Sequence, residues 1–171
     1  LPARRKFLRA EETERAHIQH YLTLVALAWP QVGFSFVSDG RLAWQLPPVP
    51  WSSDADRFTA LKERLRQLHG SETPLLPLEF SAGIEEAPDL EPGENWVLRD
   101  SGKLSRFRLW GFIGAPGVSR SSRDEQHLFV NQRPIENRGL HFALAEGYHT
   151  ALMRGRYPVC CLFLEIDPAA V

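Results

Sequence analysis

Residues 129–138 read FVNQRPIENR, and this stretch does most to decide the fold. Its apolar start is typical of a β-strand, and Asn131 then opens a turn. Asn137 is a good N-cap residue, and the segment that follows repeats apolar residues at helical spacing. The stretch therefore predicts a strand, a turn and a helix in close succession, with Arg133 and Arg138 on either side of the entry into the helix.

Apolar stripes predict three helices, over residues 10–29, 55–69 and 137–153. Pro30 ends the first helix, and Gly70 is placed to end the second in the left-handed conformation. The stripe that we expect to face the core from the first helix consists of Ile18, Leu22, Val25 and Trp29. The corresponding stripe of the third helix consists of Leu140, Leu144, Tyr148 and Leu152.

Strand-like runs alternate with these helices. A tight turn at Asp39 and Gly40 joins the first two runs into a hairpin. The last run is almost wholly apolar, as expected of a central strand that is buried on both faces. An acidic stretch at residues 85–93, which contains Pro and Gly, is predicted to be a loop. The runs are residues 32–37, 42–46, 74–82, 104–113, 127–131 and 159–166. Together the elements predict an α+β fold with helices packed on a mixed β-sheet.

The length and amino-acid composition of the chain are those of one ordinary domain. The chain has 171 residues, of which 43% are hydrophobic and 24% charged, and we see no domain boundary. No apolar run approaches the roughly 20 residues of a membrane span, and no signal segment opens the chain. Because Met153 is the single methionine, we expect the chain to be a piece of a longer protein.

The two cysteines are adjacent, at Cys160 and Cys161. Neighbouring residues of a strand point to opposite faces of a sheet, so a disulfide between them is not expected. Metal sites usually use spaced pairs of cysteines, and no such pair is present. We therefore predict two small apolar residues in a buried strand and a reducing, cytoplasmic compartment.

Two groups of residues could carry chemistry but have a simpler interpretation. His17 and His20 lie three residues apart on the first helix, yet a solvated helix face explains them better than a metal site. The glycines at 111, 114 and 117 lack the Lys-Ser/Thr of a phosphate-binding loop, so a strand end followed by a turn explains them better.

Basic residues indicate a function more clearly than the histidines and glycines do, although the net charge of the chain is only −1. Arginines on loops and at a helix start suit contact with phosphate groups, because backbone N–H groups there also favour anions. These residues could equally solvate the surface and pair within the fold. The candidates are Arg120, Arg123, Arg133 and Arg138, with Arg4, Arg5 and Lys6 at the start of the chain.

Three motifs are spaced along the chain: residues 1–8 read LPARRKFL, residues 129–134 read FVNQRP and residues 164–168 read LEIDP. In this order they resemble the N-terminal region of MutL-type DNA mismatch repair proteins. The family patterns are T-P-A-R-R-K-F-L, V-N-G-R-P and L-x-I-x-P, so the resemblance spans essentially the whole chain. Leu1 replaces the usual Thr. Gln132 replaces the usual Gly, which argues against a tight turn of the Asn-Gly kind.

The resemblance implies that residues 1–171 form a single transducer domain, without the upstream ATPase domain of the GHKL type and without the residues beyond Val171. The implied fold is like the second domain of a small-subunit ribosomal protein, with a left-handed βαβ crossover. The chain itself would then be no enzyme and would hold no cofactor. The full-length protein would be an ATPase that uses ATP and Mg²⁺.

The resemblance also implies a role in DNA mismatch repair, in which the transducer couples an ATP-driven conformational change to sequence-independent DNA binding. Arg138 matches a basic position of the family's DNA groove, and weaker candidates for that groove are Arg133, Arg120 and Arg123. The motif residues, which we expect at interdomain contacts, are Arg4, Arg5, Lys6 and Asn131.

The expected partners are DNA, mismatch-recognition and other repair proteins, the ATPase domain of the same chain and, in the full-length protein, a second copy. No membrane is expected, and the expected location is the bacterial cytoplasm in association with the nucleoid. Two alternatives stay open. The domain could be a coupling module that does not touch DNA, or an enzyme in which Glu165 or Asp167 acts with a histidine.

Overall fold

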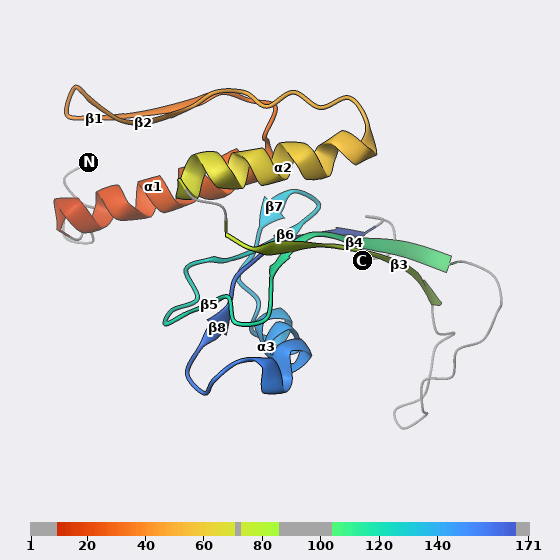
Figure 1. Cartoon of the computed structure of the whole chain (residues 1–171). Helices are drawn as coiled ribbons and strands as arrows, with labels where there is room; N and C mark the ends of the chain where they lie inside the picture. Colours follow the sequence, from red (N-terminus) through yellow and green to blue (C-terminus); the bar gives the residue numbers. More distant parts are fainter. Residues whose placement is uncertain (1–9, 71–72, 86–103, 167–171) are drawn as a thin grey trace, which may run out of the picture. The chain divides into compact units, whose positions relative to one another are not determined.

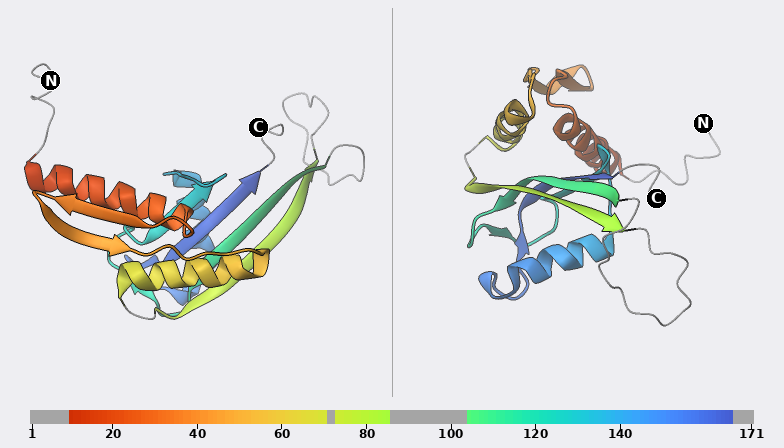
Figure 2. Two further views of the ribbon diagram at one scale, coloured as in Figure 1. Left: turned by 90° about the horizontal axis from the view of Figure 1, so that it is seen from above. Right: turned by 90° about the vertical axis from the view of Figure 1, so that its right-hand side faces the viewer.

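The computed structural model describes residues 10–70, 73–85 and 104–166 (Figures 1 and 2). The acidic stretch at residues 85–93 therefore lies almost entirely outside the described residues, as do Arg4, Arg5, Lys6 and Asp167. The contacts divide the chain into two compact units, Leu1–Thr73 and Pro74–Val171. The prediction of a single domain over residues 1–171 stays a prediction.

The first unit contains two helices and the predicted hairpin. Its elements are α1 (Glu11–Ala28), β1 (Phe34–Ser38), β2 (Arg41–Leu46) and α2 (Asp54–His69). Asp39 and Gly40 both have positive φ, at 52° and 73°, and form the tight turn that the sequence predicts. The Ser53 hydroxyl accepts a hydrogen bond from the Asp56 N–H at the start of α2. Gly70, with φ of 69°, ends this helix in the left-handed region.

The predicted core stripe of α1 is wrong at both of its ends. Ile18 is 52% exposed and Trp29 is 41% exposed. The buried residues lie in the last turn of the helix, at Ala26, Leu27 and Ala28. Helical spacing identifies which residues share a face, but only the tertiary structure decides how far along the helix that face is covered.

The second unit is built on a five-stranded sheet with the order β3-β4-β9-β6-β7. The strands are β3 (Leu75–Glu85), β4 (Leu104–Gly114), β9 (Cys160–Ile166), β6 (Gln126–Val130) and β7 (Arg133–Pro134). The β6–β9 pair is parallel, and the other neighbouring pairs are antiparallel. The predicted α+β fold with a mixed sheet is therefore confirmed.

Helix α3 (Arg138–Tyr148) connects the parallel strands β6 and β9 and covers one face of the sheet (Figures 1 and 2). This is the βαβ unit that the family resemblance implies, and the hand of its crossover stays a prediction. The helix ends before the predicted Met153, because His149 leaves the helical region with φ of 18° and ψ of −94°. A short 3-10 turn, η2 (His149–Ala151), follows.

A second, two-stranded sheet pairs β5 (Ser119–Arg120) with β8 (Tyr157–Pro158). Ser119 is the partner of Pro158, and Arg120 is the partner of Tyr157. Strands of two residues are too short to show any periodicity, so the sequence predicted neither of them, nor β7.

Strand β9 lies at the centre of the large sheet, and its residues Cys160 to Phe163 are buried, as predicted. On the face toward α3, Leu128, Cys160 and Leu162 form the core. On the other face, three aromatic rings from neighbouring strands stand in one row. Phe163 stacks on Trp110 at 4.6 Å between ring centroids and on Phe129 at 4.4 Å.

Candidate nucleic-acid interface

Arg138 is the first residue of α3, and its side chain is exposed. The Asn137 side chain caps the helix by accepting a hydrogen bond from the Leu140 N–H at 3.1 Å. No acidic residue occupies the first turn of α3. The positive end of the helix dipole and the guanidinium of Arg138 therefore act together at this point, and both favour an anion.

Arg133 lies on β7 opposite Val130, directly after the turn at Asn131 and Gln132. These two turn residues have φ of 47° and 65°, so the tight turn forms although Gln132 replaces glycine. The expectation against a tight turn is therefore wrong. The Arg133 side chain is exposed and has no ion pair among the described residues.

The side chain of Asn131 stabilises this turn through hydrogen bonds to β9. Its amide donates to the Ile166 carbonyl at 3.0 Å and accepts from the Ile166 N–H at 2.9 Å. The Asn131 backbone N–H also donates to the Leu164 carbonyl at 2.9 Å. The motif residue thus extends the pairing of β6 with β9 by one residue, and it ties the turn to the end of β9.

Arg120 and Arg123 lie at the small β5–β8 sheet, and both have partners within the fold. The Arg120 guanidinium donates to the Glu125 carboxylate at 2.6 Å. The Arg123 guanidinium lies 5.0 Å from the centroid of the Tyr157 ring, which is a cation–π contact. These contacts hold the two side chains in place, while Arg123 stays exposed.

The four predicted arginines do not converge on one centre. Arg133 lies level with Val130, at the end of β6. Gln126, at the start of the same strand, donates through its side chain to the Pro158 carbonyl of β8 at 3.1 Å. The turn that carries Arg133 and the β5–β8 sheet therefore lie at opposite ends of β6. Five residues of strand span about 13 Å between the first and last Cα atoms.

Sequence reasoning missed two further arginines at the β5–β8 sheet, Arg154 and Arg156. Arg156 donates through Nε to the Ser119 hydroxyl at 3.1 Å and through a terminal nitrogen to the Ser119 carbonyl at 2.8 Å. Arg154 is exposed, one residue after the 83% exposed Met153. The two arginines alternate in the M-R-G-R-Y run, which could have indicated an exposed basic turn. The run follows the predicted end of the third helix, so it was not considered as a site.

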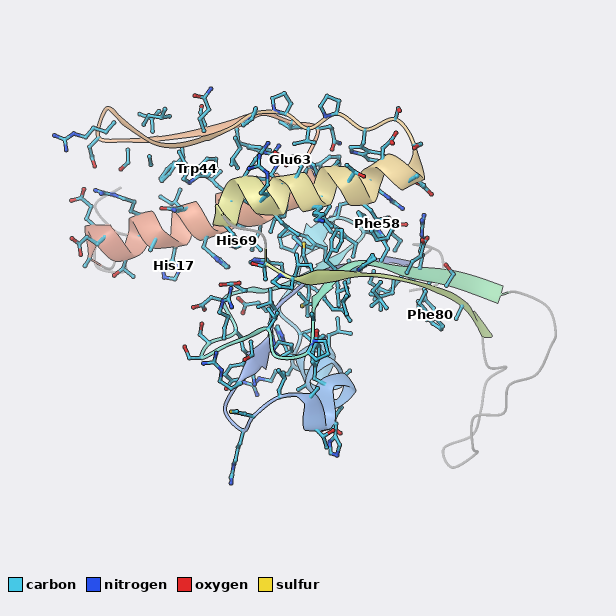
Figure 3. All side chains as sticks on the ribbon, in the orientation of Figure 1. His17, Trp44, Phe58, Glu63, His69 and Phe80 are labelled. Carbon is cyan, nitrogen blue, oxygen red and sulfur yellow. The ribbon has the colours of Figure 1, made fainter. Side chains whose placement is uncertain are left out.

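The residues considered for other chemistry do not come together in the described part of the chain. Figure 3 shows His17 pointing away from the β1–β2 hairpin, and no group of three or more His, Cys, Asp or Glu residues there could hold a metal. Glu165 accepts a hydrogen bond from the Trp110 indole N–H at 2.8 Å. An apolar cavity of about 600 Å³ lies between α3 and the sheet, and its lining contains no histidine or carboxylate.

The two cysteines are free and buried, as predicted. Burial raises the pKa of the Cys160 thiol to about 12, and it raises the pKa of Cys161 well above the usual value. Thiols that stay protonated are poor nucleophiles and poor metal ligands, so both cysteines act as core residues. Among the described residues, no helix has the length and apolar character that crossing a membrane requires.

Comparison with protein families gives a match over residues 95–171, to the family described as DNA mismatch repair protein, C-terminal domain. The MutL protein of Opitutus terrae is 39% identical over the whole of this chain. The MutL protein of Syntrophotalea carbinolica is 37% identical over 99% of the chain. The chain covers 23% of each of these two proteins, so it spans about a quarter of the curated relatives it matches.

Two solved structures share the fold. The MutL ATPase domain of Aquifex aeolicus, solved with ADP, matches with a TM-score of 0.54 and 23% identity, over 98% of this chain and 49% of that one. A structure described as the N-terminal domain of a DNA repair protein matches with a TM-score of 0.66 and 19% identity, over 92% of this chain and 43% of that one.

Proposed function

Because the chain belongs to the MutL-type family of DNA mismatch repair proteins, we propose that it serves as a transducer that couples ATP-driven conformational change to sequence-independent DNA binding. The residues matched by the family model all lie within the Pro74–Val171 unit, so we assign the transducer role to that unit. The ATPase activity, the use of ATP and Mg²⁺, contact with other repair proteins and dimerisation belong to the longer protein in this proposal.

The observation that carries the DNA contact is the exposed Arg138 at the N-terminus of α3. An arginine in this position can contact a phosphate together with the backbone N–H groups of the first helical turn. Such contacts neutralise phosphates without reading bases, so the binding is independent of sequence and falls as salt is raised. Arg133, two residues after Asn131, adds a second exposed guanidinium on the same unit.

Residues of this chain do not form a catalytic centre in our proposal. The described residues hold no cluster that could bind Mg²⁺, and the lining of the cavity under α3 contains no histidine or carboxylate. We therefore assign hydrolysis of ATP to the rest of the longer protein, and we expect purified chain 1–171 to show no ATP turnover.

The test is fluorescence anisotropy of this chain with short duplex DNA from about 20 to 200 mM salt. We expect affinity to fall steeply with salt and Arg138→Glu to weaken binding at least about fivefold at low salt. Arg41→Glu is the matched control, because Arg41 is an exposed arginine on the β1–β2 hairpin, outside the second unit.

Equal binding by Arg138→Glu and Arg41→Glu would exclude Arg138 from the interface. Absence of binding by the unaltered chain at the lowest salt would favour the alternative of a coupling module. The ion pair of Arg120 with Glu125 is the kind of internal pairing that this alternative expects.

A further inference from the structure

A hydrogen-bonded turn at Met153 to Arg156 presents Arg154 to solvent. The Arg156 N–H donates to the Met153 carbonyl at 3.1 Å, and Gly155 has φ of 77°. A positive φ at the third position of a four-residue turn is typical of type II, which glycine adopts without strain. Arg154 therefore occupies the second position of a defined turn.

The turn is fixed to β5 by the Arg156 side chain. Its two hydrogen bonds reach the hydroxyl and the carbonyl of Ser119. The next residue, Tyr157, is paired with Arg120 across the β5–β8 sheet and lies under the guanidinium of Arg123. Holding the turn in this way reduces the conformational entropy that a partner would have to remove on binding.

This corner of the fold carries more positive than negative charge. Two carboxylates in the same loop are engaged, since Glu125 accepts from Arg120 and Asp124 accepts from the Ser122 hydroxyl at 2.7 Å. Among the described residues, no ion pair is present for Arg123, Arg154 or Arg156. A polyanion such as DNA would supply the opposite charge. We call this group the β5–β8 basic corner, and its arginines are Arg120, Arg123, Arg154 and Arg156.

We propose that the β5–β8 basic corner is a second contact surface for the phosphate backbone of duplex DNA, with Arg154 as its outermost contact. This inference rests on the proposed DNA binding of the same unit. The corner and the turn that carries Arg133 lie at opposite ends of β6, so they meet different phosphates. Duplex DNA carries one negative charge per about 1.7 Å of axis, so phosphates of one duplex can contact both surfaces at the same time.

The test compares Arg154→Ala and Arg154→Glu with the unaltered chain in the same anisotropy titration. Arg154 is a suitable position because its side chain is exposed and makes no hydrogen bond or ion pair with the part of the chain that the structure describes. The slope of log affinity against log salt is negative. We expect Arg154→Ala to make it shallower by about 0.9, which corresponds to the loss of one phosphate contact. Arg154→Glu is expected to weaken binding at least about fivefold, and the matched control Arg41→Glu less than about twofold.

A loss of affinity caused by misfolding is recognised separately. Circular dichroism and the thermal midpoint of Arg154→Glu are expected to match those of the unaltered chain, because the Arg154 side chain is exposed.

Two results would overturn the inference. Equal slopes for Arg154→Ala and the unaltered chain, with Arg154→Glu matching Arg41→Glu while Arg138→Glu loses affinity, would remove the corner from the interface and leave the proposed function standing. Absence of any DNA binding by the unaltered chain would remove the inference and the proposed function together.

Discussion

The turn at Asn131 and Gln132 holds two adjacent non-glycine residues in the left-handed region. This conformation costs an ordinary residue roughly 1–2 kcal/mol, and asparagine tolerates it best. Asn131 gains two hydrogen bonds to the backbone of Ile166 in return. The Gln132 side chain makes no hydrogen bond within residues 10–70, 73–85 and 104–166 that offsets its own backbone strain.

We therefore expect opposite effects from glycine at these two neighbouring positions. Gln132→Gly is expected to raise the free energy of unfolding by about 1 kcal/mol, because glycine adopts positive φ without steric cost. Asn131→Gly is expected to lower it by about 1–2 kcal/mol, through loss of the two side-chain hydrogen bonds. Urea denaturation of the two variants measures both effects. A stabilised Asn131→Gly variant would show that the hydrogen bonds to Ile166 contribute little.

A buried arginine marks the limit of sequence reasoning at this scale. Arg64 of α2 is fully buried, although charged residues are usually exposed. Its guanidinium donates to the carbonyls of Pro30 at 2.6 Å and Val32 at 2.7 Å. Those acceptors precede it by more than 30 residues, and no local pattern places them beside α2. By contrast, the caps at Ser53 and Asn137 could be predicted, because a cap depends on residues within one turn.

At the scale of elements, β4 leaves no room for a side chain at Gly111, where it pairs with β9. This residue has φ of 135°, and a Cβ atom placed there would lie 2.1 Å from the Cys161 carbonyl oxygen. The oxygen belongs to the backbone of the central strand, so it cannot move aside as a flexible side chain would. Glycine is therefore required in β4 by the neighbouring strand rather than by a phosphate.

Alanine substitution at two glycines tests this requirement. Gly111→Ala is expected to lower the free energy of unfolding by more than about 3 kcal/mol or to prevent folding. Gly147→Ala is the matched control, because nothing lies within 4 Å of its Cβ position in α3. That variant is expected to stabilise the chain by about 0.5–1 kcal/mol through helix propensity. Thermal unfolding followed by circular dichroism measures both variants. Similar unfolding midpoints for Gly111→Ala and Gly147→Ala would show that β4 does not require glycine at this position.

The elements themselves were largely predictable, while their extent was not. Asp39 and Gly40 fix the hairpin, and the apolar run of β9 identifies the central strand, because these signals are local. The end of α3 at Tyr148 was not predictable, since Leu152 continues the apolar period beyond it. The Tyr148 hydroxyl donates to the Gly114 carbonyl at 2.6 Å, which is a contact across the fold.

At the scale of the whole molecule, the net charge decides whether the chain as a whole attracts DNA. The net charge is −1 and the pI is about 6.7, so attraction of DNA to the chain must come from local groups of arginines. The sequence suggested Arg120, Arg123, Arg133 and Arg138 but not Arg154 or Arg156. It could not show that Arg133 and Arg120 are separated by the length of β6, because that separation depends on strand pairing.

Stability is expected to fall at alkaline pH. Burial raises the pKa of Cys160 from its usual 9.0 to about 12, and burial also raises the pKa of Tyr148 from 10.0 to about 12. Above about pH 9 the unfolded chain loses the thiol proton while the folded chain keeps it, so the free energy of unfolding decreases as pH rises. The stabilisation is fully present below pH 9 and is lost progressively toward pH 12.

Urea denaturation at pH 8, 9 and 10 measures this decrease, which should be on the order of 1 kcal/mol per pH unit once pH 9 is passed. Cys160→Ala is the control, because it removes one titrating group, and its stability should decline less with pH. A flat profile for the unaltered chain would show that these thiols are not shielded from water.

The row of Trp110, Phe163 and Phe129 gives the molecule an internal optical probe. Trp110 is only 5% exposed, it stacks on Phe163, and its indole N–H is bound to Glu165. An indole held in a fixed, dry and asymmetric setting emits at shorter wavelength and gives near-ultraviolet dichroism that vanishes when specific packing is lost. A chain that keeps Trp110 as its one tryptophan would therefore report the state of its sheet by light alone, without a label and without contact with any of the surface arginines.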